Sequence, residues 1–187
     1  MSYSAPVDRI SFSLKHEAGF DRLYDAIPEL DADLISSILE EAGKFTTEVI
    51  APTNRIGDEE KAHLEAQGVV VPDAFKDAYK QYIEGGWSSV AGSKEYGGQE
   101  MPWNIVGGLN EIWHAANMSF SLNMLLTQGA IEVIEAYGTE EQKQKYLPKM
   151  ISGEWSGTMN LTEPQAGSDL ALLKSKAVPN DDNYKLY

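Results

Sequence analysis

Apolar residues recur at helical spacing through residues 31–152, and this spacing stops after Trp155. In residues 31–54 the apolar positions fall on one face, which indicates an amphipathic helix. Asp31 suits the N-cap of this helix, and Pro52 is expected to end it. The apolar positions of the face are Leu34, Ile35, Ile38, Leu39, Ala42, Phe45 and Val49. The pattern predicts a mainly α chain in which strands follow the helices.

Two further stretches have the same period. Residues 72–84 begin with Pro72, which suits a first helical turn, and end at a Gly-Gly pair, which stops a helix. Another helix is predicted to begin near Trp103, because apolar residues keep helical spacing from there to Ala116.

Residues 119–137 are apolar on almost every side, and a helix of this kind is expected to be buried. Core packing is the default explanation for these side chains. The alternative is that some of the Leu and Met side chains line a tunnel for a flexible apolar ligand. The next helix is predicted to begin at a capping box formed by Thr139 and Gln142, and Pro148 is expected to end or kink it.

The other segments are predicted to be irregular or extended. Residues 2–14 look like an irregular arm whose last apolar positions alternate, and residues 57–71 look like a charged loop. Residues 174–187 indicate a strand, a turn and a second strand. A lone hairpin is marginal in water and leaves open edges, so we expect these strands to open a larger β domain of which the chain is a fragment.

Residues 161–169 combine several demanding residue types in a short span. Glu163 precedes a proline and is therefore pushed out of the helical region. Gly167 allows a close backbone approach, and the hydroxyls of Thr162 and Ser168 can both donate and accept. Such a loop suits a flat ligand with polar edges, although the same residue types also make plain connecting turns.

The net charge of −14 over 187 residues argues against non-specific binding to nucleic acids or anionic membranes, which needs clustered Lys and Arg. The absence of cysteine excludes disulfides, zinc–thiolate sites and iron–sulfur clusters, and we expect no metal site. Residues 1–20 contain no long apolar run, so neither a signal peptide nor a transmembrane helix is expected. These features are compatible with a cytoplasmic protein.

The segment 159–169, Met-Asn-Leu-Thr-Glu-Pro-Gln-Ala-Gly-Ser-Asp, resembles the signature of the acyl-CoA dehydrogenase family. Residues 94–98 and 138–148 resemble further segments of this family in the right order. The resemblance covers the chain from about Asp31 to its end. Residues 3–14 also resemble the N-terminal extension of the branch that includes 3-methylmercaptopropionyl-CoA dehydrogenase.

The resemblance implies an arm over residues 1–30, the family's N-terminal helical domain over residues 31–155, and the first strands of its middle β domain over residues 156–187. It implies an oxidoreductase of fatty acid metabolism with FAD as cofactor. Such an enzyme removes a proton from the acyl α-carbon and a hydride from the β-carbon, so that an acyl-CoA becomes a trans-2-enoyl-CoA.

The same resemblance assigns binding roles to individual residues. Backbone N–H groups of Leu161 and Thr162, with the Thr162 hydroxyl, would meet the pyrimidine edge of the flavin, where donors stabilise developing negative charge. For the substrate, Ser168 would contact the CoA portion, and Leu122 and Leu125 are candidates for the acyl chain. The cofactor-binding set is Met159, Asn160, Leu161, Thr162, Gly167 and Ser168.

No catalytic residue is expected within the chain. In the family the catalytic base is a glutamate of the C-terminal bundle, and Glu163 belongs to the loop motif and matches no catalytic position. We therefore expect the isolated chain to bind FAD poorly and to be inactive.

Expected partners are an acyl-CoA substrate, an electron-transfer flavoprotein as electron acceptor, and further copies in a dimer or tetramer. Two alternatives remain open. One is a related flavin oxidase or monooxygenase on the same fold, and the other is a non-catalytic helical binding or assembly module.

Overall fold

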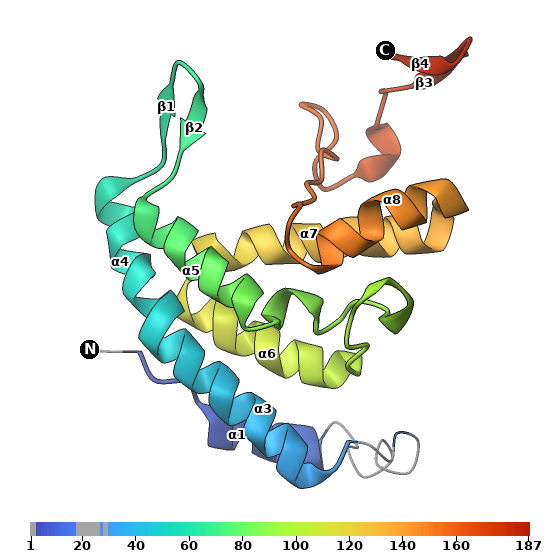
Figure 1. Ribbon diagram of the computed structural model, residues 1–187. Helices are drawn as coiled ribbons and strands as arrows, with labels where there is room; N and C mark the ends of the chain where they lie inside the picture. The colour runs from blue at the N-terminus through green and yellow to red at the C-terminus, as the bar shows by residue number, and fades with distance from the viewer. Residues whose placement is uncertain (1–2, 18–26, 28–29) are drawn as a thin grey trace.

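The computed structural model describes residues 3–17, 27 and 30–187. Figure 1 shows a group of packed helices, with two β-hairpins that project from the same end of it. The prediction of a mainly helical chain followed by short strands is confirmed. The helix α6 (Trp103–Ala116) is central, because Ile105, Leu109 and Ile112 are fully buried among neighbouring elements.

The N-terminal segment forms a helix, α1 (Val7–His16), where the sequence predicted an irregular arm. The alternation of apolar residues was misleading, because a helix brings Ile10 and Leu14 to one face, where both are buried, and leaves Phe12 exposed. The Tyr3 hydroxyl donates to the Ile112 carbonyl at 2.9 Å, which ties this segment to α6. Residues 1–2, 18–26 and 28–29 of the predicted arm lie outside the described residues.

The helices α3 (Ala32–Phe45) and α4 (Ala51–Glu60) are joined by a π-helical turn (Thr46–Ile50) into one continuous element. The Asp31 cap is confirmed, since its Oδ1 accepts from the Leu34 N–H at 2.7 Å. The prediction that Pro52 ends the helix is wrong. Pro52 lies in the first turn of α4, directly after the π turn has interrupted the regular ladder, so its missing N–H costs little.

The predicted charged loop of residues 57–71 is also corrected. It contains the last turn of α4 and an antiparallel hairpin, β1 (His63–Glu65) with β2 (Gly68–Val70). Lys61 leaves the helix with a φ of 61°, in the left-handed region. The paired residues Leu64 and Val69 are both exposed, so no buried face marks this hairpin in the sequence.

The predicted helix of residues 72–84 is α5 (Asp73–Glu84), which lies beside α4, and the connection to α6 contains two 3₁₀ turns (Trp87–Ser89 and Lys94–Tyr96). The residues on either side of the second 3₁₀ turn approach each other closely. A Cβ at Gly98 would lie only 1.9 Å from the Gly92 carbonyl oxygen, so this connection requires a residue without a side chain.

The helices α7 (Met118–Tyr137) and α8 (Glu140–Ile151) pack against each other. The capping box is confirmed by reciprocal bonds between Thr139 and Gln142 of 2.9 and 3.2 Å. Pro148 does not end α8, which continues to Ile151. The prediction that α7 is buried all round is wrong, because among the described elements other helices cover only one side of it. Its buried residues are Phe120, Ser121, Thr127 and Ile131.

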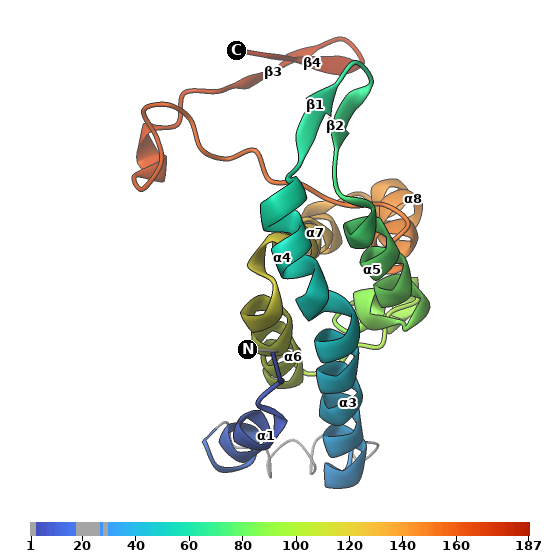
Figure 2. The ribbon, with the colours of Figure 1, turned by 90° about the vertical axis from the view of Figure 1, so that its left-hand side faces the viewer.

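The predicted C-terminal hairpin is confirmed as β3 (Ala177–Asn180) with β4 (Asn183–Leu186). Asp181 in its turn has a φ of 51°, in the left-handed region. Figure 2 shows that this hairpin stands clear of the helices, at the end where β1 and β2 also project.

Candidate functional site

The loop that follows α8 folds around a small turn within the sequence motif. The backbone N–H of Glu163 donates to the Ala166 carbonyl at 3.1 Å, and the N–H of Ala166 donates back at 3.0 Å. Ala166 is fully buried, whereas its neighbours in the loop are exposed. The motif therefore has one internal anchor and presents the rest of its surface outward.

The Glu163 carboxylate holds this turn against the segment that leads into β3. It accepts from the backbone N–H groups of Ser175 and Lys174, each at 3.0 Å, and from the Gln165 side chain. Hydrogen bonds from the Ser175 side chain and from the Lys174 and Ser175 backbone lower the pKa of Glu163 to about 2. A carboxylate so engaged is a weak base, and Glu163 acts here as a structural clamp.

The two residues just before this turn carry hydrogen-bond donors that have no acceptor among the described residues. Within the described structure, the N–H groups of Leu161 and Thr162 and the Thr162 hydroxyl make no hydrogen bond, and both residues are exposed. Free backbone and hydroxyl donors can meet the carbonyl edge of a flat ring. A Cβ at Gly167 would meet only Thr162 Cγ2, at 3.9 Å, so nothing crowds this face. The donor set therefore fits the flavin that the sequence motif implies.

The other residues of the predicted cofactor set lie along the same stretch. Asn160, Gly167 and Ser168 are exposed, and Met159 is 53% exposed. Their roles toward a cofactor or CoA stay predictions.

The start of the loop is fastened to α7 through Thr127. The N–H of Gly157 donates to the Thr127 Oγ1 at 3.1 Å, and that hydroxyl donates to the Asn123 carbonyl at 2.8 Å. A Cβ at Gly157 would lie 2.5 Å from the Ala130 Cβ and 2.9 Å from the Met150 Cε. The backbone of the loop thus lies directly on α7 at this point.

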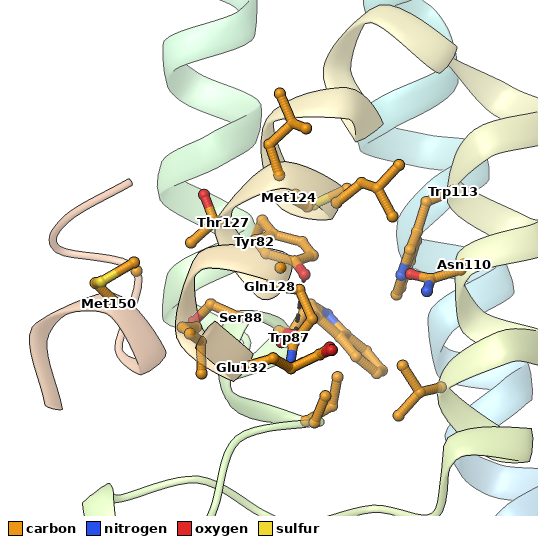
Figure 3. A pocket seen from close by; sticks show the side chains of 18 of the residues that line it. Tyr82, Trp87, Ser88, Asn110, Trp113, Met124, Thr127, Gln128, Glu132 and Met150 are labelled. Atoms are coloured by element: carbon orange, nitrogen blue, oxygen red, sulfur yellow. Dashed lines mark hydrogen bonds between the residues drawn. The ribbon is translucent and has the colours of Figure 1, made fainter. Parts of the chain in front are cut away.

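A cavity of about 380 Å³ lies beside this contact, and Figure 3 shows its lining. Side chains come from α5, α6, α7 and α8 and from the connection between α5 and α6, and most of them are apolar or aromatic. Met159 also lines the cavity, and a Cβ at Gly129 would lie 3.8 Å from the Met159 Sδ. The cavity and the donor-bearing loop are therefore contiguous.

Aromatic residues form the deep wall of the cavity. The ring centroids of Trp87 and Trp113 lie 5.4 Å apart in an edge-to-face arrangement. The Tyr82 hydroxyl donates to the Trp87 carbonyl at 3.0 Å. Burial raises the pKa of Tyr82, so its hydroxyl stays protonated. This packing makes the wall rigid.

One of the two residues predicted to contact the acyl chain lines this cavity, and the other does not. Leu125 is among the lining residues, whereas Leu122 is not and is 45% exposed. Sequence analysis did not select Trp87 or Trp113 for this site. Each reads as an ordinary core position, and only the packing of α6 on the preceding connection brings the two rings together.

The described residues offer neither a metal cluster nor a membrane-spanning helix. No cluster of three or more His, Cys, Asp or Glu side chains among them is arranged to hold a metal ion. None of the described helices is both long and apolar enough to cross a membrane.

Comparison with known proteins gives consistent matches. A family model described as "Acyl-CoA dehydrogenase, N-terminal domain" matches residues 35–154. The 3-methylmercaptopropionyl-CoA dehydrogenase of Ruegeria pomeroyi is 45% identical over 184 residues, which are 97% of this chain and 31% of that protein. A butyryl-CoA dehydrogenase of Syntrophomonas wolfei is 33% identical over 92% of this chain and 29% of its own length.

Among solved structures, a glutaryl-coenzyme A dehydrogenase in complex with glutaryl-CoA is 25% identical with a TM-score of 0.69. The match covers 84% of this chain and 38% of that one. The chain spans 31% and 29% of the lengths of the two curated relatives above.

Proposed function

Because the chain belongs to the acyl-CoA dehydrogenase family, we propose that it is part of an FAD-dependent enzyme that oxidises an acyl-CoA thioester to the trans-2-enoyl-CoA. The proposed domain division is an arm over residues 1–30, a helical domain over residues 31–155 and the start of a β domain from residue 156. This chain then supplies one wall of the cofactor site and one wall of the substrate site.

The observation that carries the proposal is the contact between the loop and the cavity. Free backbone donors at Leu161 and Thr162 begin two residues beyond Met159, whose side chain lines the cavity. A flat cofactor held at the donors would therefore lie next to an acyl chain held in the cavity. Dehydrogenation needs this adjacency, because the acceptor and the β-carbon must be held in reacting geometry.

The loop residues hold the cofactor in this proposal. FAD, when bound, supplies the two-electron acceptor for the hydride that leaves the acyl β-carbon. The N–H groups of Leu161 and Thr162 and the Thr162 hydroxyl donate to its pyrimidine edge and stabilise negative charge there. Met159, Asn160, Gly167 and Ser168 complete the contact surface, and Ser168 also reaches the CoA portion of the substrate.

The cavity receives the acyl chain and keeps water from it. Its lining by Leu125, Met124 and Trp87 offers apolar contact to such a chain. The catalytic base is proposed to come from a part of the full-length protein outside this chain. Glu163 is excluded from that role by its three partners and its low pKa.

The partners and location follow the same proposal. The electron acceptor is an electron-transfer flavoprotein, the full-length protein is a dimer or tetramer, and it works in the cytoplasm.

The test uses the full-length protein that carries this chain. Bound flavin is measured by absorbance after purification, and a panel of acyl-CoA thioesters is then added with an artificial electron acceptor. We expect stoichiometric FAD, bleaching of its visible absorbance by one or more thioesters, and a product two hydrogens lighter. Protein without flavin, or flavin that no thioester reduces, contradicts the proposal. Reduction followed by hydrogen peroxide release in air identifies an oxidase instead.

A further inference from the structure

The cavity has a polar wall that an ordinary alkyl chain would not use. Figure 3 shows Asn110 of α6 facing Gln128 and Glu132 of α7 across the cavity. Asn110 is half-buried, and within the described part of the chain its amide makes no side-chain hydrogen bond. An amide that faces a cavity without a partner is a site for a ligand's polar group.

The orientation of the Gln128 amide follows from its neighbour. Gln128 lies 3.4 Å from a carboxylate oxygen of Glu132, and only its nitrogen can donate to an ionised carboxylate. The Gln128 carbonyl oxygen is then free to accept. The wall therefore offers an acceptor at Gln128 and both a donor and an acceptor at Asn110.

Asn110 lies on the side of the cavity away from the loop, whereas Gln128 lies between Thr127 and Gly129, both of which contact the loop. The Met150 side chain marks the loop side, because its Cε would be 2.9 Å from a Cβ at Gly157. In Figure 3, Met150 and Asn110 stand at opposite sides of the cavity. A substrate whose thioester lies at the loop would pass Gln128 and point the far end of its acyl chain toward Asn110.

The electrostatics near this wall exclude an anionic acyl chain. Glu132 and Gln128 also line a neighbouring cavity of about 420 Å³, together with Glu100 and Glu135. Among the described residues that line either cavity, none is Lys, Arg or His. A terminal carboxylate would meet like charge here and no counter-charge.

We propose that Asn110 and Gln128 are specificity-determining residues that select an acyl chain with an uncharged hydrogen-bonding group, such as a hydroxyl or carboxamide, at its far end. This inference rests on the proposed dehydrogenase function. Such a group both donates and accepts, and so matches both amides. A plain alkyl chain leaves the Asn110 amide and the Gln128 carbonyl oxygen unpaired in a site from which it has displaced water.

The test compares three acyl-CoA series of matched chain length in the full-length holoenzyme: plain alkanoyl, terminal-hydroxyl and terminal-carboxyl thioesters. At the best chain length, kcat/KM for the hydroxyl series is expected to exceed the alkanoyl value by roughly three- to tenfold, which corresponds to one net hydrogen bond. The carboxyl series is expected to fall about tenfold below the alkanoyl series. The 3-methylmercaptopropionyl thioester, whose sulfur accepts weakly, is expected to lie between the first two.

The variants Asn110→Leu and Gln128→Leu replace each amide with an apolar side chain of similar size. Each is expected to reduce the hydroxyl preference, that is the ratio of kcat/KM for hydroxyl over alkanoyl thioesters, to about twofold or less. Gln81→Leu is the matched control, because Gln81 is an exposed glutamine on α5 outside the cavity lining, and it should keep the wild-type ranking.

The outcomes separate the two proposals. A holoenzyme that oxidises alkanoyl thioesters as well as or better than hydroxyl ones, or variants that keep the hydroxyl preference, overturns the specificity inference alone. FAD-loaded protein that oxidises no thioester overturns the proposed function and this inference with it. If a variant does not fold, as judged by lost FAD and circular dichroism, the wild-type ranking still decides.

Discussion

Replacing Thr127 by valine should release from α7 the loop that follows α8. Thr127 is 8% exposed, and its hydroxyl accepts from the Gly157 N–H at 3.1 Å in a buried position. Valine has nearly the same shape and cannot accept a hydrogen bond. The substitution therefore leaves one buried backbone donor unpaired and changes little else.

The expected cost is about 1–3 kcal/mol, the penalty for an unsatisfied buried N–H. Because Gly157 is the point where the loop meets α7, we expect this cost to appear as local opening of the loop. Opening would become about five- to 150-fold more frequent, at tenfold for each 1.4 kcal/mol. The helices should keep their stability, since the Asn123 carbonyl that also bonds Thr127 remains in its helical ladder.

Amide hydrogen exchange of the full-length protein measures this opening directly. The Gly157 amide should lose protection by that factor, and FAD should dissociate faster, as followed by flavin fluorescence. Thr47→Val is the matched control, because the Thr47 hydroxyl donates at 2.8 Å to the Gly43 carbonyl, which also accepts from the backbone. Unchanged exchange at Gly157 in Thr127→Val would refute the reasoning that this bond anchors the loop.

Three further predictions concern single residues. Thr162→Ala should weaken FAD retention or slow flavin reduction by about 1–3 kcal/mol, and unchanged flavin content with unchanged reduction by acyl-CoA would count against its role. The Glu163 pKa is lowered from 4.5 to about 2, so the clamp formed by its carboxylate is fully present above pH 4.5 and is lost as the pH falls toward 2. Protease cleavage of residues 161–175 should therefore increase as the pH falls through that window. Glu163→Gln should show high cleavage at every pH, without this step. Asn117→Leu removes a buried side chain that donates to the Thr53 Oγ1 at 2.8 Å and caps α7, and urea unfolding should show a loss of about 2–4 kcal/mol.

Local signals in the sequence predicted the elements that depend on short-range contacts. The Asp31 cap, the capping box of Thr139 and Gln142, and the C-terminal hairpin all form as expected. Each involves residues a few positions apart, so the physics that selects them is visible in a short window.

The errors occurred where a distant neighbour decided the outcome. α1 is helical because Ile10 and Leu14 are buried together in the core. Pro52 is the exception, because the π turn that keeps it within a helix directly precedes it in the chain. α7 is exposed on one side because the described helices cover only the other. None of these partners can be identified from local periodicity, which records only that a face is apolar.

The candidate site likewise has one part that local sequence predicted and another that depends on tertiary packing. The motif of residues 159–169 predicted a cofactor loop from sequence alone, and its turn and its free donors arise within eleven consecutive residues. The role of this loop toward a cofactor stays a prediction. The cavity, its aromatic wall and the bond between Thr127 and Gly157 join residues from separate helices and loops. Only tertiary packing decides which distant side chains meet, because hydrophobic burial is non-directional and specifies an apolar face without specifying its partner.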